Sequence, residues 1–290
     1  MSTRVAIVGP GRAGLTLGYA LAQAEAVGSL VYYGRRPEPP AHPLFIQGSA
    51  EYVFGLAPLP QDTQVLFLAV PDRVVPDLAQ AVAAQGDAPR GCAAFHLSGA
   101  LSTEVLGPLH ARGYSVGSFH PLQAIAHPVT SAERLPGSYV ALTGEPGALG
   151  VGRRLCSDLG CPTLSVPETW RPLYHAAAVL ASNFLPPLLD AAARILERAG
   201  VDHEDALPAL LPLVRGTLAN IEEVGVDAAI TGPVARGDVE TVALHLRALE
   251  GGDRRLYAFM ARELTRLMDE RIDEDTRQEL AARLTEEIDA

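Results

Sequence analysis

The chain contains no lysine: all 23 basic residues among its 290 are arginines. This absence excludes a Schiff base with a carbonyl substrate, a lysine general acid and the lysine of a phosphate-binding P-loop. Basic residues are also fewer than the 34 acidic ones, which leaves a formal net charge of −11. Because binding to phosphate polyanions requires a basic face, this charge argues against nucleic acid and anionic membrane surfaces as partners.

Cysteine is scarce as well, with Cys92, Cys156 and Cys161 as the complete set. Three cysteines do not make a disulfide framework, and Cys156 and Cys161 lack the second pair of ligands that a structural zinc site usually needs. We therefore expect no metal site, and buried thiols in a reducing cytoplasm.

Long apolar segments are also missing. The run Val5–Val8 near the N-terminus is too short for the core of a signal peptide. The most apolar helical stretch, residues 176–189, contains Pro186 and Pro187 and is bracketed by charged residues, which argues against a membrane span. We therefore expect a soluble, cytoplasmic protein.

Short apolar runs alternate with helical patterns in the first part of the chain. This alternation is typical of a parallel sheet covered by helices on both faces. The expected strands are residues 5–8, 30–33, 65–70, 93–97, 115–119, 139–142 and 163–166, and the expected helices are residues 12–24, 74–84, 102–111 and 148–159.

Beyond Pro167 only helical patterns are evident. We expect helices at 171–199, kinked at Pro186-Pro187 because proline lacks the amide donor, and at 203–224, 238–249 and 254–268, with helical spacing in the acidic tail 269–290. The sequence thus predicts an α/β protein of two domains: a Rossmann-type dinucleotide-binding domain at 1–166 and an all-helical domain at 167–290.

A glycine-rich turn, GPGRAG at residues 9–14, follows the first expected strand and opens the first expected helix. This G-x-G-x-x-G context is that of a dinucleotide site, where glycines permit a tight turn and close approach of the pyrophosphate, and the helix N-terminus supplies free amides. The predicted cofactor-binding residues are Gly9, Gly11, Arg12, Ala13 and Gly14.

The end of the second expected strand indicates which cofactor is preferred. An NAD site places a carboxylate there to accept hydrogen bonds from the ribose, whereas this chain has Arg35 and Arg36. Two guanidinium groups can hold a 2′-phosphate, so we predict NADP(H); a solvated arginine pair at a loop is the alternative. Val70 and Pro71 are predicted to form a wall of the same site, although a strand end capped by Asp72 explains them equally well.

Two polar clusters follow later strands, where ligands bind in open α/β sheets. The first, at residues 96–100, contains His96, Ser98 and Gly99; the second, at 118–123, contains His120. Histidine is suited to proton transfer near neutral pH, and Ser98-Gly99 offers a hydroxyl and an amide to a carboxylate. Each histidine taken alone is more often a hydrogen-bonded structural residue.

Two further clusters lie in the helical part. Tyr174-His175 opens the long helix and Ser182-Asn183 follows two turns later on one face, which predicts either a site or a helix–helix hydrogen bond. A loop at 231–238 ends at the expected cap Asp238 and contains Arg236, which we predict to bind a substrate carboxylate; a plain loop is the alternative.

Together these segments resemble a known family. The motifs that show the resemblance are GPGRAG at 9–14, HLSGA at 96–100, GSFHPLQ at 117–123, YHAAAVLASNF at 174–184 and TGPVARGD at 231–238. They are similar to the Rossmann-like oxidoreductases whose C-terminal half is a domain of unknown function, DUF2520. That family looks like a relative of the pyrroline-5-carboxylate reductases, the β-hydroxyacid dehydrogenases and the ketopantoate reductases. Those enzymes join a dinucleotide domain to a helical domain that often dimerises.

The resemblance implies an NADPH-dependent reductase of a small carboxylate-bearing ketone, such as ketopantoate, with hydride transfer in the cleft between the domains and a homodimer formed by the helical domain. The catalytic lysine of related enzymes has no counterpart here, so we expect histidine as the acid. The expected catalytic residues are His175, His120, Asn183 and Ser98, and the expected substrate-binding residues are His96, Gly99 and Arg236. The alternatives are an imine reductase similar to pyrroline-5-carboxylate reductase, and a non-catalytic NADP(H) sensor.

Overall fold

A computed structural model describes residues 3–268 and 271–289 of the chain. These residues divide into two compact units, one ending at Asn183 and the other beginning at Phe184. The change of composition at Pro167, from which we predicted the domain limits, precedes this division, and those limits stay a prediction.

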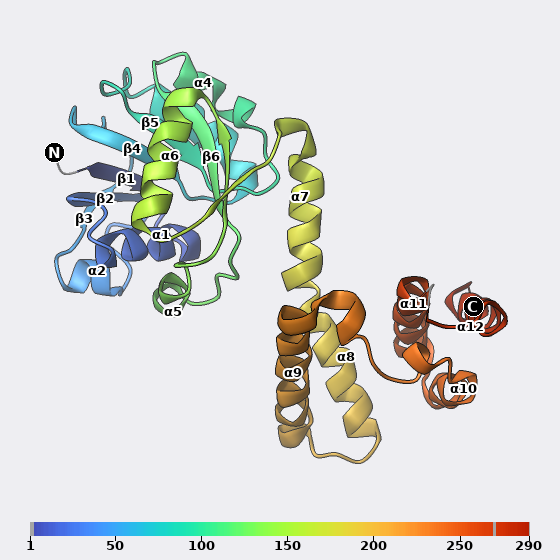
Figure 1. The fold of residues 1–290 in the computed structure, drawn as a ribbon. Coiled ribbons are helices and arrows are strands. Elements are labelled where there is room, and N and C mark those ends of the chain that lie inside the picture. The colour runs from blue at the N-terminus through green and yellow to red at the C-terminus, as the bar shows by residue number, and fades with distance from the viewer. Residues whose placement is uncertain (1–2, 269–270, 290) are drawn as a thin grey trace. The chain divides into compact units, whose positions relative to one another are not determined.

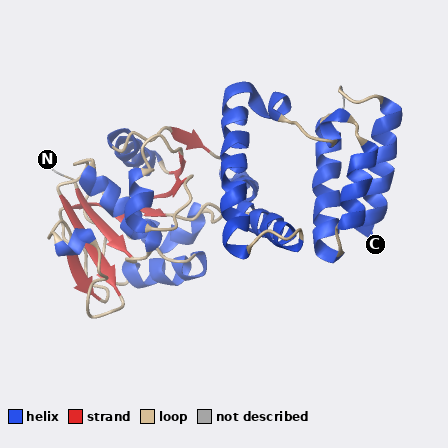
Figure 2. Ribbon diagram, turned by 90° about the horizontal axis from the view of Figure 1, so that it is seen from below, coloured by secondary structure: helices blue, strands red, loops and turns tan. Residues whose placement is uncertain are grey.

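The first unit is built on one sheet (Figures 1 and 2). In the described part of the chain eight strands hydrogen-bond in the order β3-β2-β1-β4-β5-β6-β7-β8. Their core, β3-β2-β1-β4-β5-β6, is parallel and has the strand order of a Rossmann fold. The strands are β1 (Arg4–Val8), β2 (Ser29–Gly34), β3 (Glu51–Phe54), β4 (Thr63–Leu68), β5 (Ala93–His96), β6 (Ser115–Pro121), β7 (Val140–Gly144) and β8 (Thr163–Ser165).

Helices cover both faces of the sheet, so its central strands are buried on both sides, as the continuous apolar runs predicted. Ile7, Phe67 and Phe95 belong to the core layer shared with α1, whereas Leu66 and Ala94 face the layer of α3 and α4. The helices of this unit are α1 (Arg12–Gln23), α2 (Pro43–Ile46), α3 (Val75–Ala83), α4 (Gly107–His110), α5 (Pro128–Glu133), α6 (Pro146–Asp158) and α7 (Arg171–Ala178).

The predicted fold class is confirmed, with several local differences. The edge strand β3 was missed because its residues Glu51–Phe54 are half exposed and form no apolar run. The helix expected at 102–111 is a 3-10 turn, Thr103–Leu106, followed by the short α4. β7 runs antiparallel to β6 rather than parallel. The connection between them holds only the six-residue α5, and a parallel return needs a crossover that spans the sheet.

The long helix expected at 171–199 is interrupted rather than kinked. After α7 the backbone makes a π-helical turn, η4 (Val179–Asn183), and α8 (Leu185–Arg198) then begins with Pro186 and Pro187 in its first turn. Neither proline has an amide to donate to the carbonyl four residues earlier, in Ser182 or Asn183, so the regular helix stops there and a new one starts.

The second unit is helical, as predicted. It contains α8, α9 (His203–Ala229), α10 (Val239–Ala248), α11 (Gly251–Leu267) and α12 (Glu274–Asp289). At Gly225, where φ is +79°, α9 breaks, directly after the expected end at 224. Val242, Ala258, Leu280 and Leu284 form a small core shared by α10, α11 and α12.

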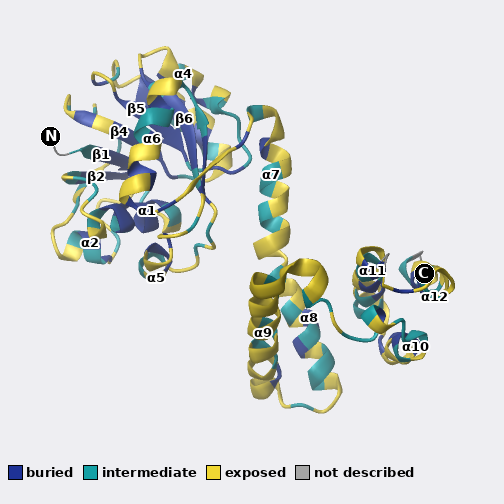
Figure 3. Cartoon of the chain, viewed as in Figure 1, coloured by how far each residue is buried: buried dark blue, intermediate teal, exposed yellow. Residues whose placement is uncertain are grey.

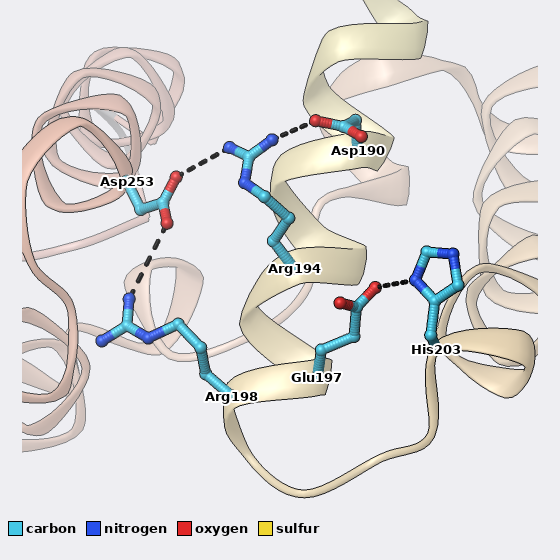
Figure 4. A network of polar contacts seen from close by, with 6 residues as sticks. All are labelled: Asp190, Arg194, Glu197, Arg198, His203 and Asp253. Carbon is cyan, nitrogen blue, oxygen red and sulfur yellow. Dashed lines mark hydrogen bonds and ion pairs between the residues drawn. The ribbon is translucent and has the colours of Figure 1, made fainter.

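Charged side chains link α8 to α11 (Figure 4). Asp253 lies between two arginines of α8, with oxygens 3.1 Å from Arg194 Nη2 and 3.8 Å from Arg198 Nη1. Arg194 also pairs with Asp190 one turn earlier on α8, and Glu197 Oε1 accepts a hydrogen bond from His203 Nδ1 at 2.8 Å. These are exposed or partly exposed pairs, so each contributes little free energy.

Much of α7, α8 and α9 is exposed (Figure 3), and the exposed residues of this part of the chain include large apolar ones. Leu173, Leu180 and Leu213 each keep about two thirds of their surface exposed, at 64%, 65% and 68%. Among the described residues, one helical run, Glu168–Arg198, is long and apolar enough to cross a bilayer by length and composition, and 6% of its most apolar stretch is buried. Exposed apolar surface of this extent is unusual in a monomeric protein.

Candidate active site

The glycine-rich turn is held tightly against the neighbouring strands. The Gly9 amide donates to Tyr33 O at 3.0 Å, and φ of +109° at this residue favours glycine. A Cβ on Gly9 would lie 2.4 Å from Ala69 O, and one on Gly14 would lie 2.3 Å from Gly9 O. Both glycines are therefore required by the close packing of the turn, as the motif predicts.

Gly11 has a different environment, because a Cβ added there would meet no atom within 4 Å. It is the N-cap residue of α1 and provides no side chain to bind the first amides of the helix. Open space beside uncapped helical amides is the arrangement in which a phosphate binds. Arg12 is exposed in the first turn of α1, and Ala13 lines a cavity described below. These residues fit a dinucleotide pyrophosphate.

Arg35 and Arg36 follow β2, the strand that pairs with β1, and both are exposed. In the part of the chain that the structure describes, neither guanidinium group has an ion-pair partner. The Arg36 carbonyl accepts a hydrogen bond from Tyr52 Oη at 2.7 Å, which anchors the backbone of the pair. The arrangement leaves both side chains available to a phosphate group, as the NADP(H) prediction requires.

The loops after β4 and β5 are joined by a hydrogen bond. Ser98 Oγ donates to Asp72 Oδ2 at 2.6 Å, and the same oxygen accepts from the amides of Ala100 and Leu101. Val70, next to Pro71, lies against Gly9. The Ser98 hydroxyl is thus fully engaged in shaping the loop, and it has no remaining proton to offer a substrate.

His96 lies beneath the same loop and is completely buried. Its Nδ1 accepts from the Ser98 amide at 3.2 Å, so the neutral ring carries its proton on Nε2. Burial lowers its pKa to about 3, and the charge of Arg171 acts in the same direction. The structure leaves this histidine no exposed surface for a substrate, in contrast to its predicted binding role.

His120 and His175 come together although they are far apart in the chain. His120 lies near the C-terminal end of β6, and His175 lies on α7. Their ring centroids are 5.8 Å apart, and the ring planes are nearly perpendicular. Both rings pack against Gly99 of the β5 loop: a Cβ there would lie 2.4 Å from His175 Nδ1 and 3.0 Å from His120 Nε2. This glycine is therefore needed for the two rings to approach the loop.

Tyr174 completes the cluster, with its hydroxyl oxygen 2.7 Å from His120 Nδ1. Burial lowers the pKa of His120 to about 4, with further lowering by the charges of His175 and Arg171 and a small opposing effect of Asp72. Burial also raises the pKa of Tyr174. At neutral pH the cluster consists of an uncharged imidazole hydrogen-bonded to an uncharged phenol.

Arg171 anchors α7 to the β5 loop from a fully buried position. Its guanidinium group donates to Leu101 O, to Ser98 O and to Thr143 Oγ1, which are all neutral acceptors. Among the described residues no carboxylate bonds directly to this guanidinium group, so its charge contributes a positive potential to the wall of the cluster. Sequence reasoning missed this residue, because an arginine at the start of a helix is typical of a solvated position.

A cavity of about 150 Å³ connects the predicted cofactor and catalytic regions. It is lined by Ala13, Thr16, Leu17, Leu97, His120, Pro121, Gln123, Ile125 and Leu135. Ala13 belongs to the glycine-rich turn, and His120 belongs to the polar cluster. A more open hollow of about 450 Å³ near Glu104 and Glu145 is lined by none of the predicted site residues.

Asn183 lies at the end of η4 and is exposed. Because one α turn and one π turn together take roughly eight residues, the π-helical turn places Asn183 on the same helical face as His175. Arg236 lies in the second unit, exposed at the end of the 3-10 turn η5 (Val234–Arg236) before α10. The cap at Asp238, whose side chain accepts from the Thr241 amide, is confirmed. The substrate roles of both residues stay predictions.

Two family models match the chain. Residues 138–264 match that of a domain of unknown function, DUF2520, and residues 50–121 match that of a Rossmann-like domain. The resemblance inferred from the motifs is thereby confirmed. None of the curated protein sequences compared with the chain matches it.

Solved structures of similar fold come from several organisms. A protein of Thermotoga maritima is 25% identical with a TM-score of 0.69, over 91% of this chain and 98% of that one. A provisionally assigned NADP oxidoreductase from Bacteroides fragilis is 22% identical with a TM-score of 0.72, over 92% and 98%. The pyrroline carboxylate reductase of Plasmodium falciparum with NADP bound is 11% identical with a TM-score of 0.63, over 99% and 98%.

Proposed function

We propose that this protein is a cytoplasmic NADPH-dependent reductase of a small carboxylate-bearing ketone, with ketopantoate as the first candidate. The observation that carries the proposal is the cavity lined by both Ala13 of the nucleotide turn and His120 of the polar cluster. A reductase needs its cofactor and its proton donor at one place, and this cavity adjoins both.

Gly9, Gly11 and Gly14 would admit the pyrophosphate at the N-terminus of α1, and Arg35 and Arg36 would hold the 2′-phosphate. The bound nicotinamide supplies a hydride to the substrate carbon. His120 or His175 then provides the proton for the oxygen that becomes negative, and the buried charge of Arg171 favours that negative charge.

Substrate binding involves fewer of the predicted residues than the sequence suggested. Ser98 acts through the loop, since its hydroxyl is already bonded to Asp72, and His96 supports the same loop from below. Gly99 leaves room for the histidines. Asn183 would orient the substrate from the face of His175, and Arg236, contributed by a second copy of the chain, would bind the substrate carboxylate.

An imine substrate is the second candidate. The reductive aminase of Aspergillus terreus, solved with NADPH, has a similar fold with a TM-score of 0.58 and 13% identity, and pyrroline carboxylate reductases are also among the similar structures. A protonated imine already carries the charge that makes its carbon reactive, so it needs less acid catalysis than a ketone. The uncharged His120 is compatible with such a substrate.

The test is NADPH oxidation by the purified protein with ketopantoate, with pyrroline-5-carboxylate, and without substrate. We expect turnover of ketopantoate, and a preference for NADPH over NADH that falls at least tenfold in Arg35→Ala/Arg36→Ala because the 2′-phosphate loses its partners. Turnover of pyrroline-5-carboxylate alone would replace the ketone by an imine. NADPH binding without turnover of either substrate would contradict the reductase proposal and favour a sensor.

The functional unit that we propose is a homodimer formed through the helical part of the chain. The exposed apolar side chains of α7, α8 and α9 support it, because a second copy would remove them from water. The net charge of −11 makes nucleic acid an unfavourable partner, and a protein surface accounts for the apolar run Glu168–Arg198 without a membrane.

A further inference from the structure

The hydrogen bond between Tyr174 and His120 has a role that neither the motifs nor the comparisons assign. It joins Oη of Tyr174 on α7 to Nδ1 of His120 on β6 at 2.7 Å, and the two rings are perpendicular with centroids 5.6 Å apart. Both side chains are partly buried, and the contact links segments 54 residues apart. The question is which of the two groups donates the hydrogen.

The chemistry of the two groups favours the tyrosine as donor. His120 is uncharged at neutral pH, because burial and the nearby charges of His175 and Arg171 outweigh that of Asp72, so one ring nitrogen carries a hydrogen and the other accepts. The phenol keeps its hydrogen, and in the described part of the chain Nδ1 of His120 is the partner recorded for this hydroxyl. Donation from Oη to Nδ1 uses both groups and leaves the hydrogen of His120 on Nε2.

The position of Nε2 makes this tautomer useful. The edge of the ring formed by Cε1 and Nε2 lies over Gly99, 3.0 Å from the position of a Cβ there, and His120 lines the cavity next to the nucleotide turn. Nε2 has no hydrogen-bond partner among the described residues, and it is not fully buried, unlike the unpartnered Nδ1 of His175. It is therefore the ring atom of His120 that can reach a ligand.

We propose that Tyr174 is a positioning residue that fixes His120 as its Nε2–H tautomer, so that the neutral imidazole, rather than an imidazolium ion, is the proton donor of the reaction. This inference rests on the proposed reductase function. It deepens that function by naming the donor atom and by adding Tyr174, which holds the atom in its protonated form.

The proton transfer balances within the pair. When hydride adds to the substrate carbon, the electron pair of the C=O bond moves to oxygen, and that oxygen takes the proton from Nε2 as the N–H bond breaks. The proton of Tyr174 Oη moves to Nδ1, which leaves the imidazole neutral and the negative charge on the phenolate. Burial raises the pKa of Tyr174 and so opposes the phenolate, the charge of Arg171 offsets part of this effect, and a proton from solvent restores the phenol.

The first test measures the tautomer without turnover. Nitrogen NMR of the protein labelled at histidine, at pH 7 and without ligand, should show His120 with hydrogen on Nε2 and a bare Nδ1. In Tyr174→Phe the chemical shift of the unprotonated Nδ1 should move to the value of a nitrogen without a hydrogen bond, and the tautomer with hydrogen on Nδ1 should become populated. Hydrogen on Nδ1 in the wild-type protein would overturn the proposal.

The second test is the pH dependence of kcat. The groups that face His120 are Asp72 on the β4 loop, His96 on β5, and Arg171, Tyr174 and His175 on α7. A neutral donor predicts a kcat that is constant from pH 6 to pH 8. A fall of roughly tenfold per pH unit over that range would show that an imidazolium ion is the donor and would overturn the proposal.

Tyr174→Phe should lower kcat at least tenfold and leave KM and NADPH binding within about twofold, because the phenyl ring keeps the packing and loses the hydroxyl. The control is Tyr139→Phe, at a tyrosine that is half exposed and makes no side-chain hydrogen bond to any described residue, and it should retain full activity. An unchanged kcat in Tyr174→Phe would contradict the inference. If the NMR result is as expected but no substrate is reduced, the reductase function and the donor role fail, while the tautomer assignment stands.

Discussion

Gly99 decides, at the scale of a residue, whether the two histidines of the site can occupy their positions. A methyl group on this residue would stand 2.4 Å from His175 Nδ1, so the ring would have to move. We expect Gly99→Ala to reduce kcat at least tenfold while the dissociation constant of NADPH, measured by fluorescence titration, stays within threefold. Gly107→Ala is the matched control, since a Cβ there meets nothing within 4 Å. Equal activity of the two variants would show that the approach of His175 to the loop is unimportant.

His96 makes the stability of the protein depend on pH. Its pKa is about 3 in the folded protein and near 6.5 when unfolded, so below pH 6.5 the unfolded chain binds a proton that the folded chain does not. The contribution of this residue is therefore fully present above pH 6.5 and is lost as the pH falls toward 3, by about 1.4 kcal/mol per pH unit.

The measurement is the free energy of unfolding by urea at pH 7, 6 and 5. His96→Gln should be less dependent on pH than the wild-type protein by roughly 1 kcal/mol per unit between pH 6 and pH 5. His127→Gln, at an exposed histidine, serves as the control and should keep the wild-type slope. An unaltered slope in His96→Gln would mean that this histidine is protonated in the folded protein.

Individual site residues were predicted unevenly. The glycines of the turn were recognisable because each has one steric task that a motif records; the close packing at Gly9 and Gly14 is found here, and the space beside Gly11 is open. Ser98 and His96 carry reactive groups in a plausible place, but the sequence does not show that Asp72 and the Ser98 amide already occupy those groups. Hydrogen-bond partners from other segments decide whether such a group is free, and only the fold brings them near.

Among the elements, α7 matters most for the site because it delivers Arg171, Tyr174 and His175 together. Its start is tied to the sheet by Arg171, which bonds to two carbonyls and to Thr143, and by Glu168, which accepts from the Thr103 amide. The spacing of the three residues follows from one helical turn. Loss of the Arg171 contacts should therefore loosen the whole cluster.

We expect Arg171→Met to lower the free energy of unfolding by about 3 kcal/mol, because three acceptors lose their donor in a buried place. Denaturation by urea measures this, and Arg153→Met, at an exposed arginine of α6, is the control with a change below about 0.5 kcal/mol. A stability equal to that of the control would show that the Arg171 contacts carry no net free energy.

Regular elements with a repeated pattern were predictable. The parallel strands are buried on both faces, and the amphipathic spacing of the helices follows from one buried side, so both leave a signal over several residues. The π turn at Val179–Asn183 and the reversed direction of β7 leave no such signal. The π turn depends on which backbone carbonyls the following prolines leave unpaired. The direction of β7 depends on the path that the chain takes between β6 and β7.

For the whole molecule, the balance between buried and exposed apolar surface is the informative quantity. The sheet unit has a dense core, whereas α7, α8 and α9 expose large apolar side chains to water. Exposed surface of this extent is costly in a monomer, since each buried CH₂ group contributes about 0.8 kcal/mol when it leaves water. The proposed dimer removes that cost.

Light scattering at micromolar concentration should give twice the mass of the 30.6 kDa chain. Leu213→Glu/Leu218→Glu should shift the protein toward the mass of one chain, because carboxylates would replace exposed apolar groups of α9. Ile46→Glu, at an exposed apolar residue of the sheet unit, should leave the mass unchanged. A wild-type mass of 30.6 kDa would contradict the dimer.

The amino-acid sequence by itself determined the alternation of strands and helices, the glycine-rich turn, the arginines in place of a carboxylate and the absence of a lysine acid, because each is a local pattern or a count. Only the tertiary structure decided that His120, Tyr174 and His175 form one cluster over Gly99, that Ser98 is occupied and that Arg171 is buried. Those outcomes depend on contacts between segments tens of residues apart, and the energy of such contacts cannot be inferred from the sequence of one segment alone.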